Sequence, residues 1–121
     1  MTTIRKGLRF ENRARTYLQE RGLRLIQSNY HCRFGEIDLV MHDGNTLCFI
    51  EVKFRKSLHF GGAAAALSRP KQRKIIKSAL FYLSVHKHFV NKAIRFDALL
   101  IQRQDDGSDQ IEWIQNAFYA E

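Results

Sequence analysis

The chain is poor in cysteine and has no long hydrophobic run, and each absence narrows the kind of protein it can be. Its only cysteines, Cys32 and Cys48, do not form a C-x-x-C pair, so we expect both thiols to be reduced and structural. No apolar run approaches the roughly 20 residues that span a bilayer, and the first residues lack the apolar region of a signal peptide. A soluble, cytoplasmic protein with no membrane partner is expected.

Several catalytic and binding motifs are also missing. The sequence has no G-x-S-x-G, P-loop or G-x-G-x-x-G motif, so a serine nucleophile or a nucleotide site has no support. His86 and His88 lie two residues apart, which is not the spacing of a helical metal pair, and we expect them at the surface. With 121 residues and 45% hydrophobic content, the chain fits a single domain over residues 1–121.

Acidic residues are absent from residues 52–96, although this stretch holds eleven of the 20 lysines and arginines. The net charge of +8 therefore originates in one segment. Such a surface suits a polyanion, because contacts with phosphates release counterions, and a merely solvated basic surface is the alternative. The residues expected to contact nucleic acid are Arg55, Lys56, Arg69, Lys71, Arg73, Lys74 and Lys77.

Two segments have the pattern of helices. An apolar stripe predicts an amphipathic helix over residues 6–21 that ends at Gly22, and the stripe consists of Phe10, Ala14, Tyr17 and Leu18. Pro70 suits the first turn of a second helix over residues 70–88. The residues of this helix expected to face the core are Ile75, Ile76, Ala79, Leu80 and Leu83. Residues 59–68, rich in glycine and alanine, are predicted to be a connector, with a lid over a substrate as the alternative.

Strands are predicted over residues 23–30, 36–42, 46–54, 93–102 and 110–117. Two of them each carry a carboxylate among apolar residues. Asp38 lies in the motif GEIDLV, and Glu51 lies in FIEVK, two residues before Lys53. Carboxylates are seldom buried unless they are paired or bind a metal, so the pattern predicts a divalent-cation site for Mg²⁺ or Mn²⁺.

The dipeptide Asp43-Gly44 predicts a tight hairpin between the two acid-bearing strands. A loop centred on it would place Asp38 opposite Phe49, and Glu36 opposite Glu51. One face of the sheet would then hold Glu36, Asp38, Phe49, Glu51 and Lys53, and the other would hold Ile37, Leu39, Cys48, Ile50 and Val52. Asp38 and Glu51 would be diagonal neighbours, roughly 7 Å apart at the backbone. A bulge would place them on opposite faces.

These residues also suggest roles in phosphodiester hydrolysis. Asp38 and Glu51 are expected to bind the metal, with Glu11 as a third ligand, directly or through water. Lys53 would stabilise negative charge or help to deprotonate the attacking water. The alternatives are a Glu11 paired with Arg15 on the helix surface, and a half-exposed strand in which Glu51 and Lys53 form cross-strand ion pairs.

The two motifs resemble the D…E-x-K core of the restriction-endonuclease-like, or PD-(D/E)xK, nuclease superfamily. More closely, the chain resembles the small bacterial YraN family and is similar in layout to archaeal Holliday-junction resolvases. Further matching positions are Gly7, Glu11, Ala14, Asn29, Tyr30, Phe60, Gly61, Lys71, Arg95, Phe96 and Asp97. The resemblance implies an α/β three-layer fold with a central mixed sheet of about five strands flanked by helices, in the order α-β-β-β-α-β-β. It also implies catalytic positions at Glu11, Asp38, Glu51 and Lys53.

The function expected is therefore a divalent-metal-dependent endonuclease that hydrolyses phosphodiester bonds in DNA, with branched or structured DNA among its candidate substrates. One alternative is a non-catalytic nucleic-acid-binding module with the nuclease fold. Another is a scaffold subunit whose basic face meets an acidic protein. A homodimer is expected by analogy with nucleases that cut two strands with two sites. Trp113, Phe118 and Tyr119 are expected to pack against the core, with a dimer interface as the alternative.

Overall fold

The computed structural model of the protein describes residues 3–55 and 67–120, with the backbone alone for residues 3–8. Its elements are α1 (Thr3–Glu20), β1 (Arg24–Cys32), β2 (Gly35–Asp43), β3 (Thr46–Arg55), α2 (Arg69–Val85), the short 3₁₀ helix η2 (Lys87–Phe89), β4 (Ala93–Arg103) and β5 (Asp109–Phe118). The predicted α/β class and order of helices and strands are confirmed, apart from η2. Lys56, Phe60, Gly61 and the rest of the predicted connector up to residue 66 lie outside the described residues.

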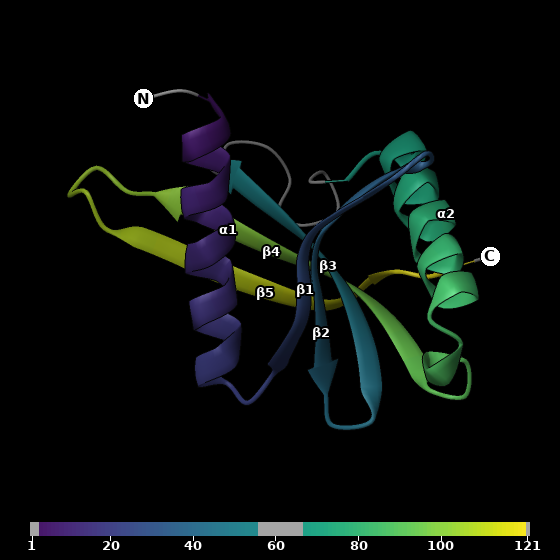
Figure 1. Cartoon of the computed structure of the whole chain (residues 1–121). Coiled ribbons are helices and arrows are strands. Elements are labelled where there is room, and N and C mark those ends of the chain that lie inside the picture. The colour runs from purple at the N-terminus through teal and green to yellow at the C-terminus, as the bar shows by residue number, and fades with distance from the viewer. Residues whose placement is uncertain (1–2, 56–66, 121) are drawn as a thin grey trace.

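The five strands form one mixed sheet in the order β1-β2-β3-β4-β5, in which only β3 and β4 run parallel. The two helices pack against opposite faces of this sheet, as Figure 1 shows. Under α1, Phe10, Ala14 and Leu18 are buried against apolar residues of β2 and β3, which confirms the predicted stripe. Among the described residues, no helix is both long and apolar enough to pass through a membrane.

Gly22 ends α1, as predicted. Its φ of +95° is a left-handed conformation that favours glycine. The amide of Leu23 donates to the carbonyl of Leu18 at 3.1 Å, and the amide of Gly22 donates to the carbonyl of Gln19 at 3.1 Å. This pair of hydrogen bonds is a Schellman cap, which turns the chain directly into β1.

Helix α2 begins after Ser68, whose hydroxyl accepts a hydrogen bond from the Lys71 amide at 3.3 Å. Ile75, Ala79 and Tyr82 form its buried face, whereas Leu80 is 54% exposed. The prediction that Leu80 faces the core is therefore wrong, because each residue turns an α-helix by about 100° and Leu80 follows the fully buried Ala79.

The end of α2 also differs from the prediction. The helix stops at Val85, three residues early, and η2 then brings Phe89 into the core. His86 is half-buried rather than at the surface, because its ring stacks on Tyr82 with 4.0 Å between the ring centroids. His88 is exposed, as expected.

The register between β2 and β3 corrects the predicted pairing. Asp43 pairs with Thr46 and Val40 pairs with Phe49, so the two loop residues are Gly44 and Asn45. Gly44 has a φ of +60°, which the first position of such a loop requires in a II′ turn. Asp38 does not face Phe49, and continuing the observed register beyond the Leu39–Ile50 pair places Asp38 opposite Glu51. Glu36 turns instead toward His31 of β1, at 3.4 Å between Oε2 and Nδ1.

The alternation of side chains along β2 is broken at Asp38. Leu39 and Met41 pack under α1, but Ile37 packs with Val40 and Phe49 on the α2 side. The prediction that Ile37 shares a face with Leu39 is therefore wrong. Asn29, which lies opposite Asp38 between two observed β1–β2 pairs, has a left-handed φ of +54°. Both strands are thus irregular at the same point.

Beyond this irregularity, the β1–β2 hairpin bends across to α2, as Figure 1 shows. Tyr30 packs edge-on against Tyr82, and Phe34 at the tip packs against Phe81. Gly35 has a φ of +149°, and a Cβ atom there would lie 3.3 Å from Ser78 Oγ. A glycine at this position therefore permits the close approach of the hairpin to the helix.

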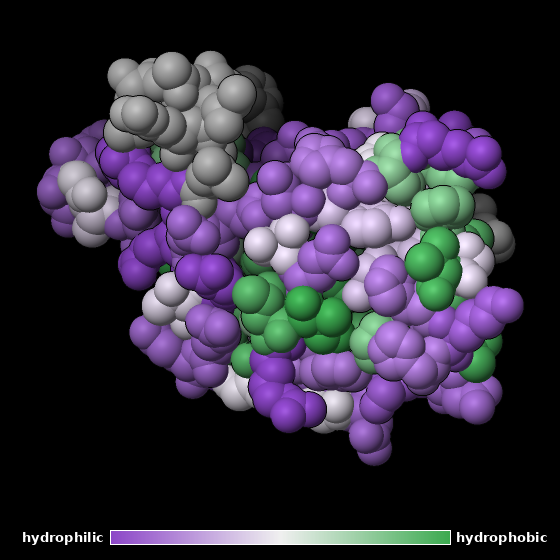
Figure 2. Space-filling view, viewed as in Figure 1, coloured by the Kyte–Doolittle hydropathy of each residue, from purple (hydrophilic) through white to green (hydrophobic). Residues whose placement is uncertain are grey.

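Near the C-terminus, Trp113 and Phe118 pack against the two core clusters, as expected, whereas Tyr119 is 70% exposed. Figure 2 shows that the face in front of β1 is mostly hydrophilic, with a compact hydrophobic area over β1 between the two helices.

Candidate functional site

Asp38 and Glu51 meet where β2 and β3 lie side by side. Asp38 Oδ2 accepts a hydrogen bond from the Val52 amide at 2.8 Å. Only 6% of the Glu51 side chain is exposed, and its Oε1 atom lies 3.3 Å from Lys71 Nζ. Among the described residues, no N–H or hydroxyl group donates to the buried Oε2 atom of Glu51, and the Asp38 carboxyl is its neighbour. A buried carboxylate that lacks donors is costly while ionised, so Glu51 either shares a proton with Asp38 or binds a cation.

The two carboxyl groups influence each other's protonation. Burial, followed by the negative charge of Asp38, raises the pKa of Glu51 to about 8, although Lys71 opposes the shift. Burial also raises the pKa of Asp38, against the hydrogen bonds with the Val52 amide and with the Glu51 side chain. At neutral pH without a metal, Glu51 therefore retains a proton, which it shares with Asp38.

Asp97 shows how a buried carboxylate is satisfied when it is structural. It is fully buried, and it accepts hydrogen bonds from Arg95 Nε at 2.9 Å, Trp113 Nε1 at 3.0 Å and the Asn116 amide at 3.1 Å. Arg95 also binds Asp43 at 2.9 Å, so this network ties β2, β4 and β5 together. Glu51 lacks such donors among the described residues, since only the Asp38 carboxyl lies beside its second oxygen.

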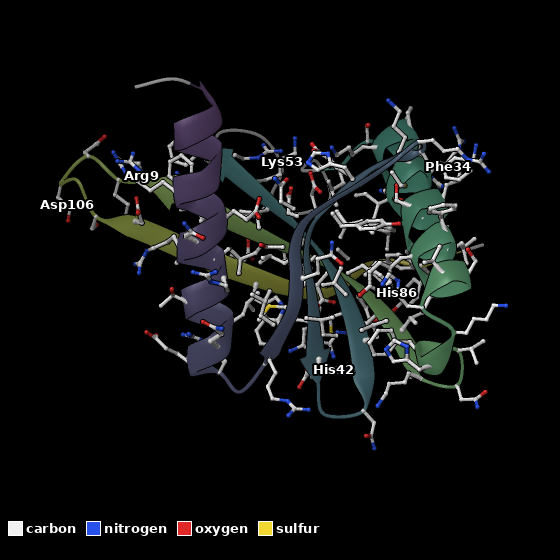
Figure 3. All side chains as sticks on the ribbon, in the orientation of Figure 1. Arg9, Phe34, His42, Lys53, His86 and Asp106 are labelled. Carbon is white, nitrogen blue, oxygen red and sulfur yellow. The ribbon has the colours of Figure 1, made fainter. Side chains whose placement is uncertain are left out.

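Lys71 contacts the acidic pair, which the sequence did not predict. It was expected to bind nucleic acid, and Lys53 was the cation expected beside Glu51. Lys53 lies near the end of β3 between the two helices (Figure 3), and it forms no salt bridge within the part of the chain that the structure describes. The only available signal was the basic cluster at the start of α2, which does not reveal which lysine reaches across to β3.

Glu11 lies on the face of α1 toward the acidic pair. Burial, followed by the negative charges of Asp38 and Glu36, raises the pKa of Glu11 to about 7, and Arg15 opposes this shift. Within the described residues, however, no three His, Cys, Asp or Glu side chains lie close enough to hold one metal ion. A role for Glu11 through a bridging water stays a prediction.

A cavity of about 320 Å³ lies between the β1–β2 hairpin and α2, and Lys71, one of its lining residues, connects it to Glu51. It is lined by His31, Cys32, Gly35, Glu36, Lys71, Lys74 and Ile75. Burial alone would raise the pKa of the Cys32 thiol, but hydrogen bonds, above all with Ser78, lower it. Of the two lysines that line this cavity, Lys71 contacts the acidic pair, where a phosphate would need a cation.

The predicted nucleic-acid-binding residues fall into separate places. Lys71 and Lys74 line the cavity beside Glu51, and Arg55 ends β3. Arg69, Arg73 and Lys77 instead line a second cavity of about 270 Å³, together with Gln72, Ile76 and Tyr119. The single basic surface expected from the sequence is therefore divided by α2.

Comparisons with known proteins identify similar chains without an assigned activity. A family model described as "Uncharacterised protein family UPF0102" matches residues 10–101, which include Glu11, Asp38, Glu51 and Lys71. A UPF0102 protein of Psychromonas ingrahamii is 52% identical over 113 residues, covering 93% of this chain and 88% of the relative. One of Nitrosomonas eutropha is 46% identical over 117 residues, covering 97% and 96%. One of Legionella pneumophila is 44% identical over 118 residues, covering 98% of each chain.

Proposed function

We propose a function from the site itself, because the chain belongs to the UPF0102 family and that name states no activity. UPF0102 is the YraN family that was expected from the sequence. The protein is a divalent-metal-dependent endonuclease that hydrolyses phosphodiester bonds in DNA. The observation that carries this proposal is the Asp38–Glu51 pair, two buried carboxyl groups in contact, in which Glu51 Oε2 has no N–H or hydroxyl donor among the described residues and only the Asp38 carboxyl beside it. A cytoplasmic location and a homodimer belong to the same proposal.

The residues at the pair fit a hard divalent cation. Mg²⁺ prefers oxygen ligands, keeps several waters and is commonly bound through one or two carboxylates, so the absence of a third close acid among the described residues is compatible with it. Asp38 and Glu51 would hold the ion, which would supply a bound water of lowered pKa and neutralise charge on the phosphate. Glu11 would contact that water from α1.

The nearby cations would act on the phosphate. In the metal-free protein, Lys71 Nζ lies 3.3 Å from Glu51 Oε1. With a divalent cation at the acidic pair, Lys71 would be free to turn toward the cavity that it lines with Lys74, where both lysines would bind phosphate oxygens. Lys53, without a salt bridge to any described residue, would stabilise the negative charge that develops during the reaction.

The fold supports the same proposal. A mixed sheet between two helices, with the acids on the adjacent strands β2 and β3, is compatible with membership of the restriction-endonuclease-like superfamily. Fold alone does not assign an activity, so the argument depends on the acidic pair.

A non-catalytic nucleic-acid-binding module is the second candidate. One observation favours it: among the described residues no three potential ligands gather around one ion. In this case the basic surfaces of α2 would suffice for function. Salt-dependent DNA binding that is unchanged in Glu51→Gln, with no metal binding by calorimetry, would support this candidate over the nuclease.

The test of the nuclease is a cleavage assay. Purified protein is incubated with branched, duplex and single-stranded DNA, in Mg²⁺, in Mn²⁺ or in EDTA. Metal-dependent cleavage is expected for the parent protein, and Asp38→Asn and Glu51→Gln should each abolish it. Glu20→Gln is the matched control, because Glu20 is an exposed acid at the end of α1. Cleavage that survives Asp38→Asn, or no cleavage of any of these DNAs, would overturn the proposal.

A further inference from the structure

Helix α2 is cationic on two flanks, and only one flank faces the acidic pair. Between Arg69 and Val85 the helix contains five lysines and arginines and no acid. Lys71 and Lys74 line the cavity beside Glu51. At about 100° per residue, Arg73 and Lys77 lie roughly 160° and 120° around the helix from Lys71, on a flank turned away from the acidic pair. The proposed catalytic site therefore leaves these cations without a role.

The second flank forms a groove with its own chemistry. Arg69, Arg73 and Lys77 follow one another at intervals of four residues, a rise of ~6 Å each along the helix. Ile76 supplies an apolar surface, and Gln72 supplies an amide. The cavity of about 270 Å³ that these side chains line is closed on another side by Tyr119.

Tyr119 is an exposed aromatic residue with an anchored backbone. Tyr119 as a whole is 70% exposed, but the preceding Phe118 is buried and stacks on Phe96 with 5.0 Å between the ring centroids. Figure 1 shows the C-terminal end of the chain beside α2. The groove thus combines a row of cations with an exposed aromatic residue whose neighbour in the chain is anchored in the core.

We propose that this groove binds an unpaired nucleotide of a nucleic-acid strand, with the base stacked on Tyr119 and the neighbouring phosphates on Arg73 and Lys77. Cations that follow the backbone and an aromatic ring for the base are the two components of single-strand recognition. An acidic peptide would use the cations but would leave the aromatic ring without a base. A duplex would also leave Tyr119 unused, because its bases are already stacked.

The inference rests on the proposed nuclease function and narrows its substrate. Lys71 and Lys74 would bind the strand at the acidic pair, while the groove on the other flank of α2 would hold an unpaired segment of the same substrate. DNA that contains both paired and unpaired segments is then preferred over a blunt duplex.

The experiment measures binding without cleavage. Fluorescence anisotropy in EDTA follows a labelled oligo(dT) and a blunt duplex of equal length with the parent, Tyr119→Ala, Tyr119→Phe and Arg73→Ala. Tyr119→Ala should weaken oligo(dT) binding by about fivefold or more, since the loss of one base–aromatic stack weakens binding by at least about this factor. The same change should leave duplex binding unchanged. Tyr119→Phe should bind like the parent. Arg73→Ala should reduce the slope of log K against log salt for oligo(dT) by ~0.7.

Lys87→Ala is the matched control, because Lys87 is an exposed cation in η2 outside the groove. The inference would be overturned if Tyr119→Ala and the parent bound oligo(dT) with equal affinity, or if Tyr119→Ala lost as much affinity for the duplex as for oligo(dT).

The result of this binding experiment can be separated from that of the cleavage assay. If the protein cleaves DNA but Tyr119→Ala does not change oligo(dT) binding, only the proposal for the groove is overturned. If the groove binds oligo(dT) but the protein does not cleave DNA, only the proposal of a nuclease is overturned.

Discussion

At the scale of single residues, the acidic pair is distinguished by how few hydrogen-bond donors reach its carboxyl groups. Asp97 is as deeply buried as Glu51, yet three donors surround its carboxylate. Glu51 has Lys71 on one oxygen, and its other oxygen has only the Asp38 carboxyl beside it and no N–H or hydroxyl donor among the described residues. Natural proteins tolerate such costs mainly at functional sites.

The pH dependence of stability follows from these shifts. The pKa values of Glu51 and Glu11 are raised from 4.5 to about 8 and about 7 in the folded protein. As pH rises above 4.5, the unfolded chain releases protons that the folded protein keeps, so stability falls until pH passes about 8. The melting temperature in EDTA should therefore fall less steeply between pH 5 and pH 8.5 in Glu51→Gln than in the parent, by calorimetry. Equal slopes would contradict the assigned pKa of Glu51.

Lys71 and Lys53 should differ in their effect on stability. At pH 8.5, where Glu51 is ionised, Lys71→Met leaves a buried carboxylate without its cation and should destabilise the protein by about 1–3 kcal/mol. Lys53→Met should change stability by no more than about 0.5 kcal/mol, because Lys53 has no salt bridge with the described residues. Urea unfolding of the two variants is the measurement. Equal losses would show that the ion pair at 3.3 Å does not stabilise the fold.

At the scale of elements, the coincident irregularity of β1 and β2 positions the site. Asn29 takes a left-handed conformation at the residue opposite Asp38, and the faces of β2 exchange at the same point. The predicted consequence of a bulge was that the two acids would separate. In the structure they remain adjacent, because the irregularity begins at Asp38 itself and the register from Leu39 to Asp43 is regular.

Asn29 variants test this role. Asn29→Gly should retain metal-dependent cleavage and stability to within about 0.5 kcal/mol, since glycine adopts a positive φ readily. Asn29→Val should cost about 1–3 kcal/mol, because a β-branched residue strongly disfavours that conformation, and it should weaken metal binding by displacing Asp38. Thermal unfolding and calorimetric metal titration of the two variants provide the comparison. A fully functional Asn29→Val would contradict the positioning role.

The sequence predicted the elements well, because their signals are local. Gly22 and Pro70 mark helix boundaries by backbone geometry alone, and the stripe of α1 is periodic. The predicted pairing of β2 with β3 was wrong because the loop lies one residue later in the chain than predicted. Asp43-Gly44 and Gly44-Asn45 both suit a tight loop, and only the packed sheet selects one of them. The contact between Lys71 and Glu51 joins a helix to a strand, and no periodic pattern encodes such a pairing.

At the scale of the whole molecule, metal binding should be visible as stabilisation. A cation that binds the ionised Asp38–Glu51 pair displaces the proton held there, so Mg²⁺ or Mn²⁺ should raise the melting temperature more at pH 8 than at pH 6. At a hundredfold excess over the dissociation constant, the gain is ~2.7 kcal/mol. The rise should vanish in Asp38→Asn and persist in Glu20→Gln. An equal rise at both pH values would indicate binding elsewhere.

The order of strands in the sheet also bears on how the protein folds. Strands β1, β2 and β3 are antiparallel neighbours joined by short turns, whereas β4 pairs in parallel with β3 only after the chain has passed through α2. Contacts between neighbours in sequence form faster than distant ones, so the three-stranded meander should be the folding nucleus. The two carboxylates would then be brought together early, before Lys71 can dock against them. The folding barrier should therefore rise with pH, and removing the charge of Glu51 should accelerate refolding in stopped-flow experiments.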